Sequence, residues 1–140
     1  MSKLFRNVMI SVAFCLCIFS LVSCGMGING GEAKEFIRDF FDAVVAEDYE
    51  KAEEFLHPDR PADLELFFLS IEEEEDLDFQ EGIEIEKYTG FSSSLYDSTV
   101  GGSTYELTMR AKVGERDVVF TIEIVQNDNG YGIYNFDLNA

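Results

Sequence analysis

The sequence predicts an α+β domain in which N-terminal helices pack on a curved antiparallel sheet. Apolar residues recur at spacings of three and four between residues 32 and 71, which is the period of an amphipathic helix. From Ile83 onward they alternate with polar residues, which is the period of a strand buried on one face. The chain has 140 residues, of which 46% are apolar, and this is typical of one folded domain.

Three helices are expected in the first half of the chain. The first covers residues 33–46, and Asp48 can cap a second, which ends before Pro58 because proline disfavours helical geometry in the residue before it. A third begins near Pro61 and should fray in the acidic run 72–76, since acidic charge is unfavourable at a helix C-terminus. The apolar faces contain Phe36, Ile37, Phe40, Phe41 and Val44, then Tyr49, Ala52, Phe55 and Leu56, then Leu64, Phe67, Phe68 and Ile71.

The second half is expected to form a meander of antiparallel strands. Residues 91–102 predict an irregular connection with a short strand at 95–96, and residues 114–116 predict a hairpin turn. A later turn contains the pair Asn129-Gly130, which is typical of the primed turns (types I′ and II′) that connect hairpin strands. The expected strands begin at Ile83 and then cover residues 104–113, 118–124 and 131–138. The face that the helices must cover offers Tyr105, Leu107, Met109, Phe120, Ile122 and Phe136.

The N-terminal segment predicts an export signal. Lys3 and Arg6 precede an apolar stretch, residues 8–22, which is interrupted only by Ser11 and Ser20. The stretch is short for a membrane-spanning helix, which needs about 20 apolar residues, and it fits the hydrophobic region of a secretory signal peptide. A single short transmembrane anchor is the alternative that length alone leaves open.

The end of this segment, Leu21-Val22-Ser23-Cys24, resembles the lipobox of bacterial lipoproteins. The resemblance implies a signal peptide over residues 1–23, cleavage before Cys24, and a diacylglycerol thioether on Cys24. It places the mature chain at the bacterial cell membrane, lipid-anchored on the extracytoplasmic face. Two acyl chains make such an anchor stable, because one chain alone gives only marginal association.

The remaining cysteines and glycines agree with this processing. Cys15 and Cys17 leave with the signal peptide and the lipid consumes Cys24, so no thiol remains for a disulfide, a metal site or thiol catalysis. Residues 24–31 then form a glycine-rich tether. Its reach of about 15 Å keeps the domain close to the bilayer.

The acidic charge is confined to the mature part of the chain. Residues 1–23 hold two basic and no acidic residues, whereas residues 24–140 hold 28 acidic and 8 basic ones, a formal charge of −20. A charge of this sign excludes nucleic acid as a partner and argues against electrostatic attraction to an anionic membrane. The lipid on Cys24 must therefore provide the membrane attachment.

The predicted domain, residues 32–140, resembles the nuclear transport factor 2-like (NTF2-like) superfamily. The likeness is carried by the amphipathic helix of residues 33–46, the step Glu47-Asp48-Tyr49-Glu50-Lys51-Ala52 and the closing hairpin Gly130-Tyr131-Gly132-Ile133-Tyr134. Tyr131 stands where a tryptophan is usual, and Gly132 adds an unexpected flexible position. The resemblance implies a cystatin-like sheet curled around a cone-shaped apolar cavity, which different members use for binding, for isomerase or hydrolase chemistry, or for dimerisation.

No catalytic set stands out in the sequence. Isomerase chemistry needs a carboxylate in apolar surroundings and a donor aimed at the developing oxyanion. Tyr105 and Tyr134 are candidate inward donors, but no inward carboxylate accompanies them, and packed aromatics are the ordinary interpretation. His57, the only histidine, is followed by Asp59, yet no nucleophile or third partner lies near in sequence. A surface position at a helix end is its ordinary interpretation.

The acidic run 72–76 is continued by Asp78 and Glu81, and its carboxylates could bind Ca²⁺. It lacks the glycine and the ligand spacing of an EF-hand loop, so a solvated, self-repelling loop is the ordinary interpretation. We therefore predict no metal site and no cofactor.

The leading functional hypothesis is a non-enzymatic binding module whose ligand is a protein partner, a small apolar molecule or a second copy of the chain. The alternative is a small cavity enzyme of isomerase or dehydratase type. Dimerisation would use the exposed sheet face, where Val119 and Val125 lie among polar residues. An inward carboxylate beside a tyrosine in a deep pocket would favour the enzyme, and a filled core would favour the binding module.

Overall fold

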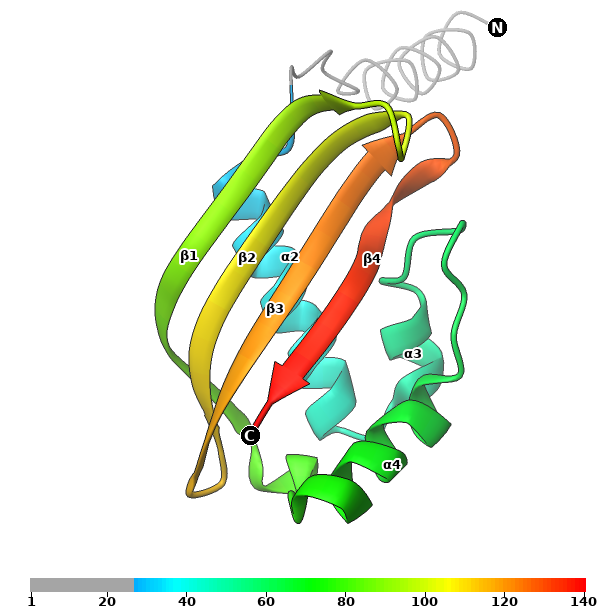
Figure 1. The fold of residues 1–140 in the computed structure, drawn as a ribbon. Coiled ribbons are helices and arrows are strands. Elements are labelled where there is room, and N and C mark those ends of the chain that lie inside the picture. The colour runs from blue at the N-terminus through cyan, green and yellow to red at the C-terminus, as the bar shows by residue number, and fades with distance from the viewer. Residues whose placement is uncertain (1–26) are drawn as a thin grey trace, which may run out of the picture.

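A computed structural model describes residues 27–140, in which three helices precede a four-stranded antiparallel sheet (Figure 1). The α+β class predicted from the sequence is confirmed. The predicted signal peptide, residues 1–23, lies outside the described residues. The helices are α2 (Gly30–Val45), α3 (Tyr49–Glu53), α4 (Leu64–Glu75) and the 3-10 turn η1 (Phe79–Glu81). The strands are β1 (Ile83–Asp97), β2 (Gly102–Val113), β3 (Arg116–Asn127) and β4 (Gly130–Asn139).

Helix α2 begins at Gly30, inside the segment expected to be a tether. Asn29 makes this possible as a cap, since its Oδ1 accepts hydrogen bonds from the backbone N–H groups of Gly31 and Glu32 at 2.9 and 3.2 Å. The chain between Cys24 and the first described helix is therefore shorter than its glycine content suggests.

The start of α4 differs from its prediction. The helix begins at Leu64 rather than near Pro61, because the carboxylate of Asp63 caps it by accepting a hydrogen bond from the N–H of Leu66 at 2.9 Å. The cap of α3 falls where the sequence predicts it, at Asp48.

The end of α4 also differs, because the acidic run expected to fray is helical as far as Glu75. A hydrogen bond to the 3-10 turn η1 stabilises this end of α4. Glu72 accepts a hydrogen bond at 3.0 Å from the backbone N–H of Phe79, the first residue of η1. Asp76 then ends the helix in the left-handed conformation, with φ of 53°.

The four strands form a meander in the order β1-β2-β3-β4. The expected irregular connection over residues 91–102 is wrong, because β1 pairs with β2 as far as Asp97, which lies opposite Gly102. Register shifts occur at three places along this pair and let the serine-rich strand follow its neighbour. The same shifts interrupt the two-residue alternation in the sequence, which is why the pattern did not predict the full strand.

The turn between β3 and β4 is not the primed turn that the sequence predicts. Its connecting residues are Asp128 and Asn129, and neither has the positive φ that a primed turn requires. The Asn127 side chain holds the turn instead, because its Oδ1 accepts hydrogen bonds from the N–H groups of Asn129 and Gly130 at 2.9 and 3.2 Å. The turn between β2 and β3 lies at Gly114 as predicted.

Helix α2 lies across one face of the sheet, and the side chains between them form the core (Figure 1). Aromatic rings from both layers meet there. Phe41 and Phe120 have ring centroids 4.8 Å apart, and those of Phe68 and Phe136 are 5.7 Å apart. The prediction for the covered sheet face is confirmed, since its members belong to this core: Tyr105, Leu107, Met109, Phe120 and Ile122 are buried, and Phe136 is half-buried.

Candidate functional site

Cys24, the predicted lipidation site, lies outside the described residues, so its modification stays a prediction. No helix within residues 27–140 combines the length and the apolar character needed to cross a membrane.

The interior between helices and sheet is where a cavity enzyme would hold its acid and base. Tyr105 lies there, 8% exposed, with its hydroxyl under the first residue of α2: a Cβ at Gly30 would come within 2.8 Å of it. Tyr134 does not face inward, because it sits at a register shift of β4, with the Arg60 guanidinium 4.5 Å from its ring centroid. No carboxylate of residues 27–140 is buried, so the described interior holds no acid–base pair.

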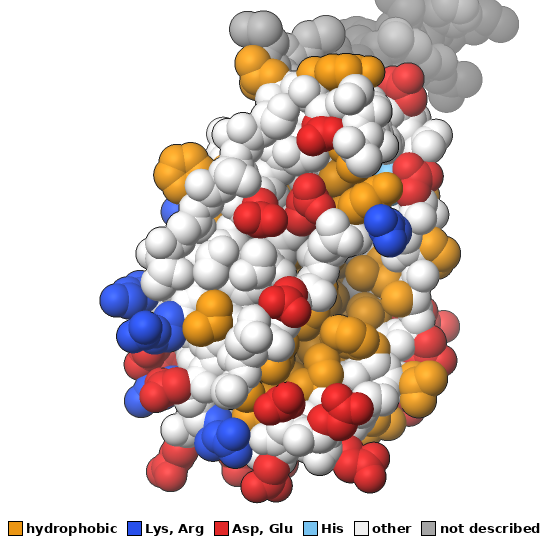
Figure 2. Space-filling model, viewed as in Figure 1, with side chains coloured by type: hydrophobic (Ala, Val, Ile, Leu, Met, Phe, Trp, Pro, Cys, Tyr) orange, Lys and Arg blue, Asp and Glu red, His pale blue; other side chains and the backbone are white. Residues whose placement is uncertain are grey.

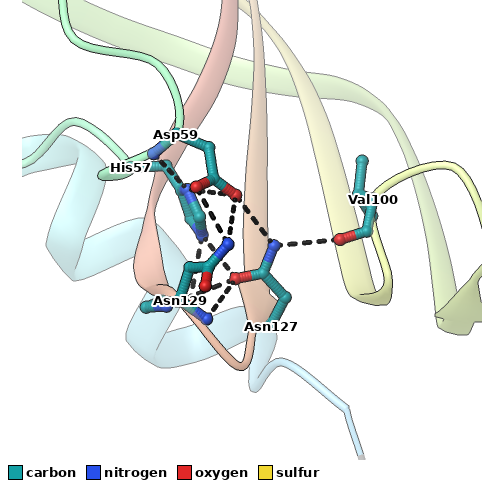
Figure 3. A network of polar contacts seen from close by, with 6 residues as sticks. His57, Asp59, Val100, Asn127 and Asn129 are labelled. Carbon is teal, nitrogen blue, oxygen red and sulfur yellow. Dashed lines mark hydrogen bonds and ion pairs between the residues drawn. The ribbon is translucent and has the colours of Figure 1, made fainter.

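His57 is fully buried, and the predicted surface position is wrong. The segment that carries it pairs with the free edge of β4. The N–H of His57 donates to the carbonyl of Ile133 at 2.9 Å, and the N–H of Ile133 donates to the carbonyl of Phe55 at 2.8 Å. The segment passes so close to Gly132 that a Cβ there would lie 2.5 Å from the backbone nitrogen of His57. The imidazole therefore lies against the β3–β4 turn (Figure 3).

The two ring nitrogens of His57 have partners of opposite kinds. Nδ1 lies 3.0 Å from the backbone N–H of Asp59, which can only donate, so Nδ1 accepts. Nε2 lies 3.1 Å from the carbonyl oxygen of Gly130 and 3.0 Å from Oδ1 of Asn127, so Nε2 donates. These partners match the tautomer of the ring that carries its proton on Nε2.

Asp59 and two asparagines complete the cluster (Figure 3). The Asp59 carboxylate accepts hydrogen bonds from the amide of Asn129 at 3.0 and 3.2 Å and from the amide of Asn127 at 3.2 Å. These bonds, with that of Asn129 the larger cause, lower the pKa of Asp59 below its usual value. Asn127 also donates to the carbonyl of Val100 at 2.9 Å, which joins the β1–β2 turn to the cluster.

The cluster of His57, Asp59, Asn127 and Asn129 connects three parts of the chain by hydrogen bonds: the segment after α3, the β3–β4 turn and the β1–β2 turn. Both ring nitrogens are occupied by hydrogen bonds within the fold, so the described cluster offers no free base for catalysis. Sequence reasoning did not identify the two asparagines. They resemble ordinary turn residues, and their partners lie about 70 positions away in the chain.

The predicted exposure of Val125 is also wrong. Val125 is fully buried and Val119 is half-buried. Val125 is the register partner of Gly132, which lies against the backbone of the His57 segment. Because Val125 is buried, it is not available to a second copy of the chain.

The pKa of Asp59 gives a stability prediction with a definite sign. The pKa of Asp59 is lower in the folded state than in the unfolded state, where it is near 3.8. The ionised carboxylate therefore stabilises the fold at pH values above the unfolded pKa, and this contribution is lost as the pH falls through the folded pKa. The Asp59→Ala variant is expected to be less stable than the wild type at pH 7, and the difference should shrink at pH 3. Urea unfolding at both pH values measures it, and an undiminished difference at pH 3 would contradict the assignment.

The acidic run does not form a convergent ligand set. Residues 72–75 lie on α4, where successive side chains project in different directions around the helix. Within residues 27–140, no group of three or more His, Cys, Asp or Glu side chains is placed to hold a metal ion.

An apolar cleft of about 260 Å³ opens between β4 and the segment that leads into α4. Figure 2 shows hydrophobic side chains in this hollow, with acidic side chains and a basic side chain at its rim. Beyond Ile133, the outer edge of β4 has no strand partner among the described residues. Most of the lining is apolar, but Arg60 and Asn135 also belong to it. The apolar lining residues include Leu56, Ala62, Leu64, Phe67 and Phe136.

A second groove, of about 470 Å³, lies between α2 and β1. Its lining carries charges of both signs, including Arg38, Asp42, Glu84 and Lys87, all of them exposed. This mixed, solvated lining gives the groove no preference for an apolar ligand or for a ligand of one charge. The cleft beside β4 is therefore the stronger candidate for a binding site.

Comparisons of the chain with protein-family models, with curated proteins and with solved structures found no significant match. The fold and the site define a small α+β protein with three described helices, a four-stranded open sheet and an apolar cleft at the edge of that sheet.

Proposed function

We propose that this chain is a non-enzymatic binding module, held on the extracytoplasmic face of the bacterial cell membrane by a lipid on Cys24. The motif Leu21-Val22-Ser23-Cys24 supports the anchor. We propose further that the domain is an NTF2-like, or cystatin-like, fold. The order of three helices followed by a four-stranded meander supports that assignment.

The apolar cleft beside the unpartnered edge of β4 carries the binding proposal, and its proposed occupant is an extended segment of a protein partner. An edge strand can pair with an added strand through its backbone, while a neighbouring cleft accepts alternate side chains of that strand. The cleft volume of about 260 Å³ is below the roughly 300–1,000 Å³ of pockets that enclose small molecules. This size favours an extended peptide over a small apolar ligand.

The proposed partner segment carries basic residues between its apolar ones. Arg60 lines the cleft, but its guanidinium lies over the Tyr134 ring, 4.5 Å from the ring centroid. Asp63 and Asp137 are exposed and adjoin cleft-lining residues in the sequence, and the mature chain has a formal charge of −20. Complementary charge speeds encounter and disfavours acidic partners.

The packing of the interior supports a binding module over the alternative of an isomerase or dehydratase. Such an enzyme needs a carboxylate beside a donor in an open cavity. Here the ring of Phe68 packs against those of Phe40, Phe79 and Phe136, with centroid distances from 5.0 to 6.2 Å, where an open cavity would otherwise lie. A second copy paired through the β4 edge is the other binding arrangement, and light scattering would detect it.

A peptide selection tests the proposed occupant. Random peptides displayed on phage would be selected against the lipoprotein in detergent micelles. We expect enrichment of sequences that alternate apolar residues with Lys or Arg. Binding should be lost in Ala62→Trp, which fills the cleft from an exposed position, and kept in Leu69→Trp, which adds the same ring to α4 outside the cleft lining. Failure to enrich such sequences, or equal binding by both variants, would contradict the proposal.

Incorporation of labelled palmitate tests the anchor separately. The wild type is expected to carry the label and Cys24→Ala to lack it, because the diacylglycerol is attached through the Cys24 thiol. Cys15→Ala is the matched control and should be labelled like the wild type. An unlabelled wild-type protein would rule out the lipid anchor.

A further inference from the structure

Three large apolar side chains are exposed on the second half of β1: Phe91 (74%), Leu95 (66%) and Tyr96 (69%). These three residues are called the hairpin tip; Leu95 and Tyr96 lie close to the turn into β2, and Phe91 lies earlier in the strand, opposite Leu107. Isolated exposed apolar residues are ordinary on a protein surface, but large ones gathered on one element mark an interaction surface. The Phe91 ring stacks on that of Tyr105, with centroids 6.4 Å apart, so it is held in place while most of its surface stays open.

The hairpin tip lies beside the point where the chain leads back to Cys24. A Cβ added at Gly27, the first described residue, would lie 2.8 Å from Cδ2 of Leu95. Gly27 has φ of +89°, so a side chain there would be strained as well as crowded. Cys24 is three residues away, a span of at most about 10 Å for extended chain. A lipid on Cys24 therefore brings the tip to the bilayer surface.

The sequence around the hairpin tip is nearly free of charge. Residues 88–105 contain one charged residue, Asp97, although the mature chain carries 28 acidic and 8 basic residues. The Asp97 carboxylate is engaged within its own turn, where it accepts a hydrogen bond from the N–H of Thr99 at 2.7 Å. An anionic bilayer repels acidic protein surface, so the β1–β2 end approaches a membrane at lower electrostatic cost than the neighbouring β3–β4 turn, which carries Asp128 and lies against Asp59. Helix α4, with four consecutive glutamates, lies at the opposite end of the domain (Figure 1).

We propose that the hairpin tip inserts into the interfacial layer of the bilayer and sets the orientation of the domain on the membrane. Aromatic and leucine side chains favour this layer, where their apolar surface is buried and the tyrosine hydroxyl stays hydrated. The inference rests on the proposed anchor at Cys24. The lipid supplies the main affinity for the membrane, and Phe91, Leu95 and Tyr96 determine which end of the domain faces it.

Fluorescence quenching in vesicles tests this proposal. The mature lipoprotein has no free thiol once Cys24 is lipidated, so one introduced cysteine can carry an environment-sensitive fluorophore. Leu95→Cys labels the tip, and Leu66→Cys labels α4 at a position of matched exposure, 64% against 66%. Each labelled protein would be reconstituted in vesicles of phosphatidylethanolamine and phosphatidylglycerol. Acrylamide serves as the aqueous quencher, because a neutral molecule is not repelled by the acidic domain.

We expect the probe at position 95 to be quenched by brominated lipids and to be several-fold less accessible to acrylamide than the probe at position 66. Adding Phe91→Ser and Tyr96→Ser should restore the access of acrylamide to position 95. Equal acrylamide quenching at the two positions would overturn the proposal. Shielding at position 95 that persists in detergent micelles, without quenching by brominated lipids, would also overturn it and would assign the tip to a second copy of the chain.

Flotation of the same vesicles reports the anchor independently of the tip. Protein that floats with the vesicles but shows equal quenching at both positions would retain the anchor and contradict the orienting role of the hairpin tip. Protein that does not float would contradict the anchor, and the inference would fail with it.

Discussion

Replacing Phe68 with alanine is expected to lower the free energy of unfolding by about 4 kcal/mol, within the range for removing a buried aromatic ring. Phe68 is fully buried, and its ring centroid lies 5.0 Å from that of Phe79, 5.7 Å from that of Phe136 and 6.2 Å from that of Phe40. These neighbours belong to η1, β4 and α2. Because separate elements meet on this one ring, they cannot all close on the space that the substitution leaves.

Urea unfolding measures this loss as a lower midpoint with an unchanged slope. Phe91→Ala is the matched control, since the same ring is removed from a position that is 74% exposed, and its effect should stay within about 0.5 kcal/mol. A loss below about 2 kcal/mol for Phe68→Ala would contradict the central place of this ring in the core.

Replacing Gly132 with alanine is expected to lower the free energy of unfolding by about 3 kcal/mol. This is the upper end of the usual cost of adding a methyl-sized group to a site that is already filled. The added Cβ would lie 2.5 Å from the backbone nitrogen of His57 and 2.6 Å from the carbonyl carbon of Leu56. Both are backbone atoms and cannot rotate away. The segment would have to lift from β4, breaking its hydrogen bonds to Ile133 and drawing the imidazole out of its cluster.

The matched control is Gly90→Ala, where the nearest atom to the new Cβ is the Thr108 Cβ at 3.8 Å, an ordinary contact. Its stability should change by less than about 1 kcal/mol. Nitrogen-15 NMR of His57 gives a second readout. The wild type should show one neutral tautomer with the proton on Nε2, and Gly132→Ala should show averaged tautomers. Unchanged stability and an unchanged His57 spectrum in Gly132→Ala would contradict the close approach of the His57 segment to this residue.

The elements and buried faces that follow local periodicity could be predicted from the sequence. Phe40 and Phe41 recur at helical spacing in α2, and Tyr105, Leu107 and Met109 alternate in β2, because one face of each element is removed from water. The cap at Asp48 was likewise predictable, since a cap depends on residues within one turn.

The features that depend on distant contacts could not be predicted. Nothing near His57 in the sequence indicates that Asn127 and Gly130 will enclose its ring. Gly132 suggested only flexibility, whereas the structure requires glycine there because another segment passes within van der Waals distance. The cleft beside β4 also arises only when the edge of a late strand meets an early segment.

The mass of the mature N-terminal peptide tests the central claim, the lipid anchor, most directly. The account predicts a peptide that begins at Cys24, lacks residues 1–23 and carries the added mass of a diacylglycerol thioether. A chain that retains residues 1–23 and an unmodified Cys24 thiol would contradict it.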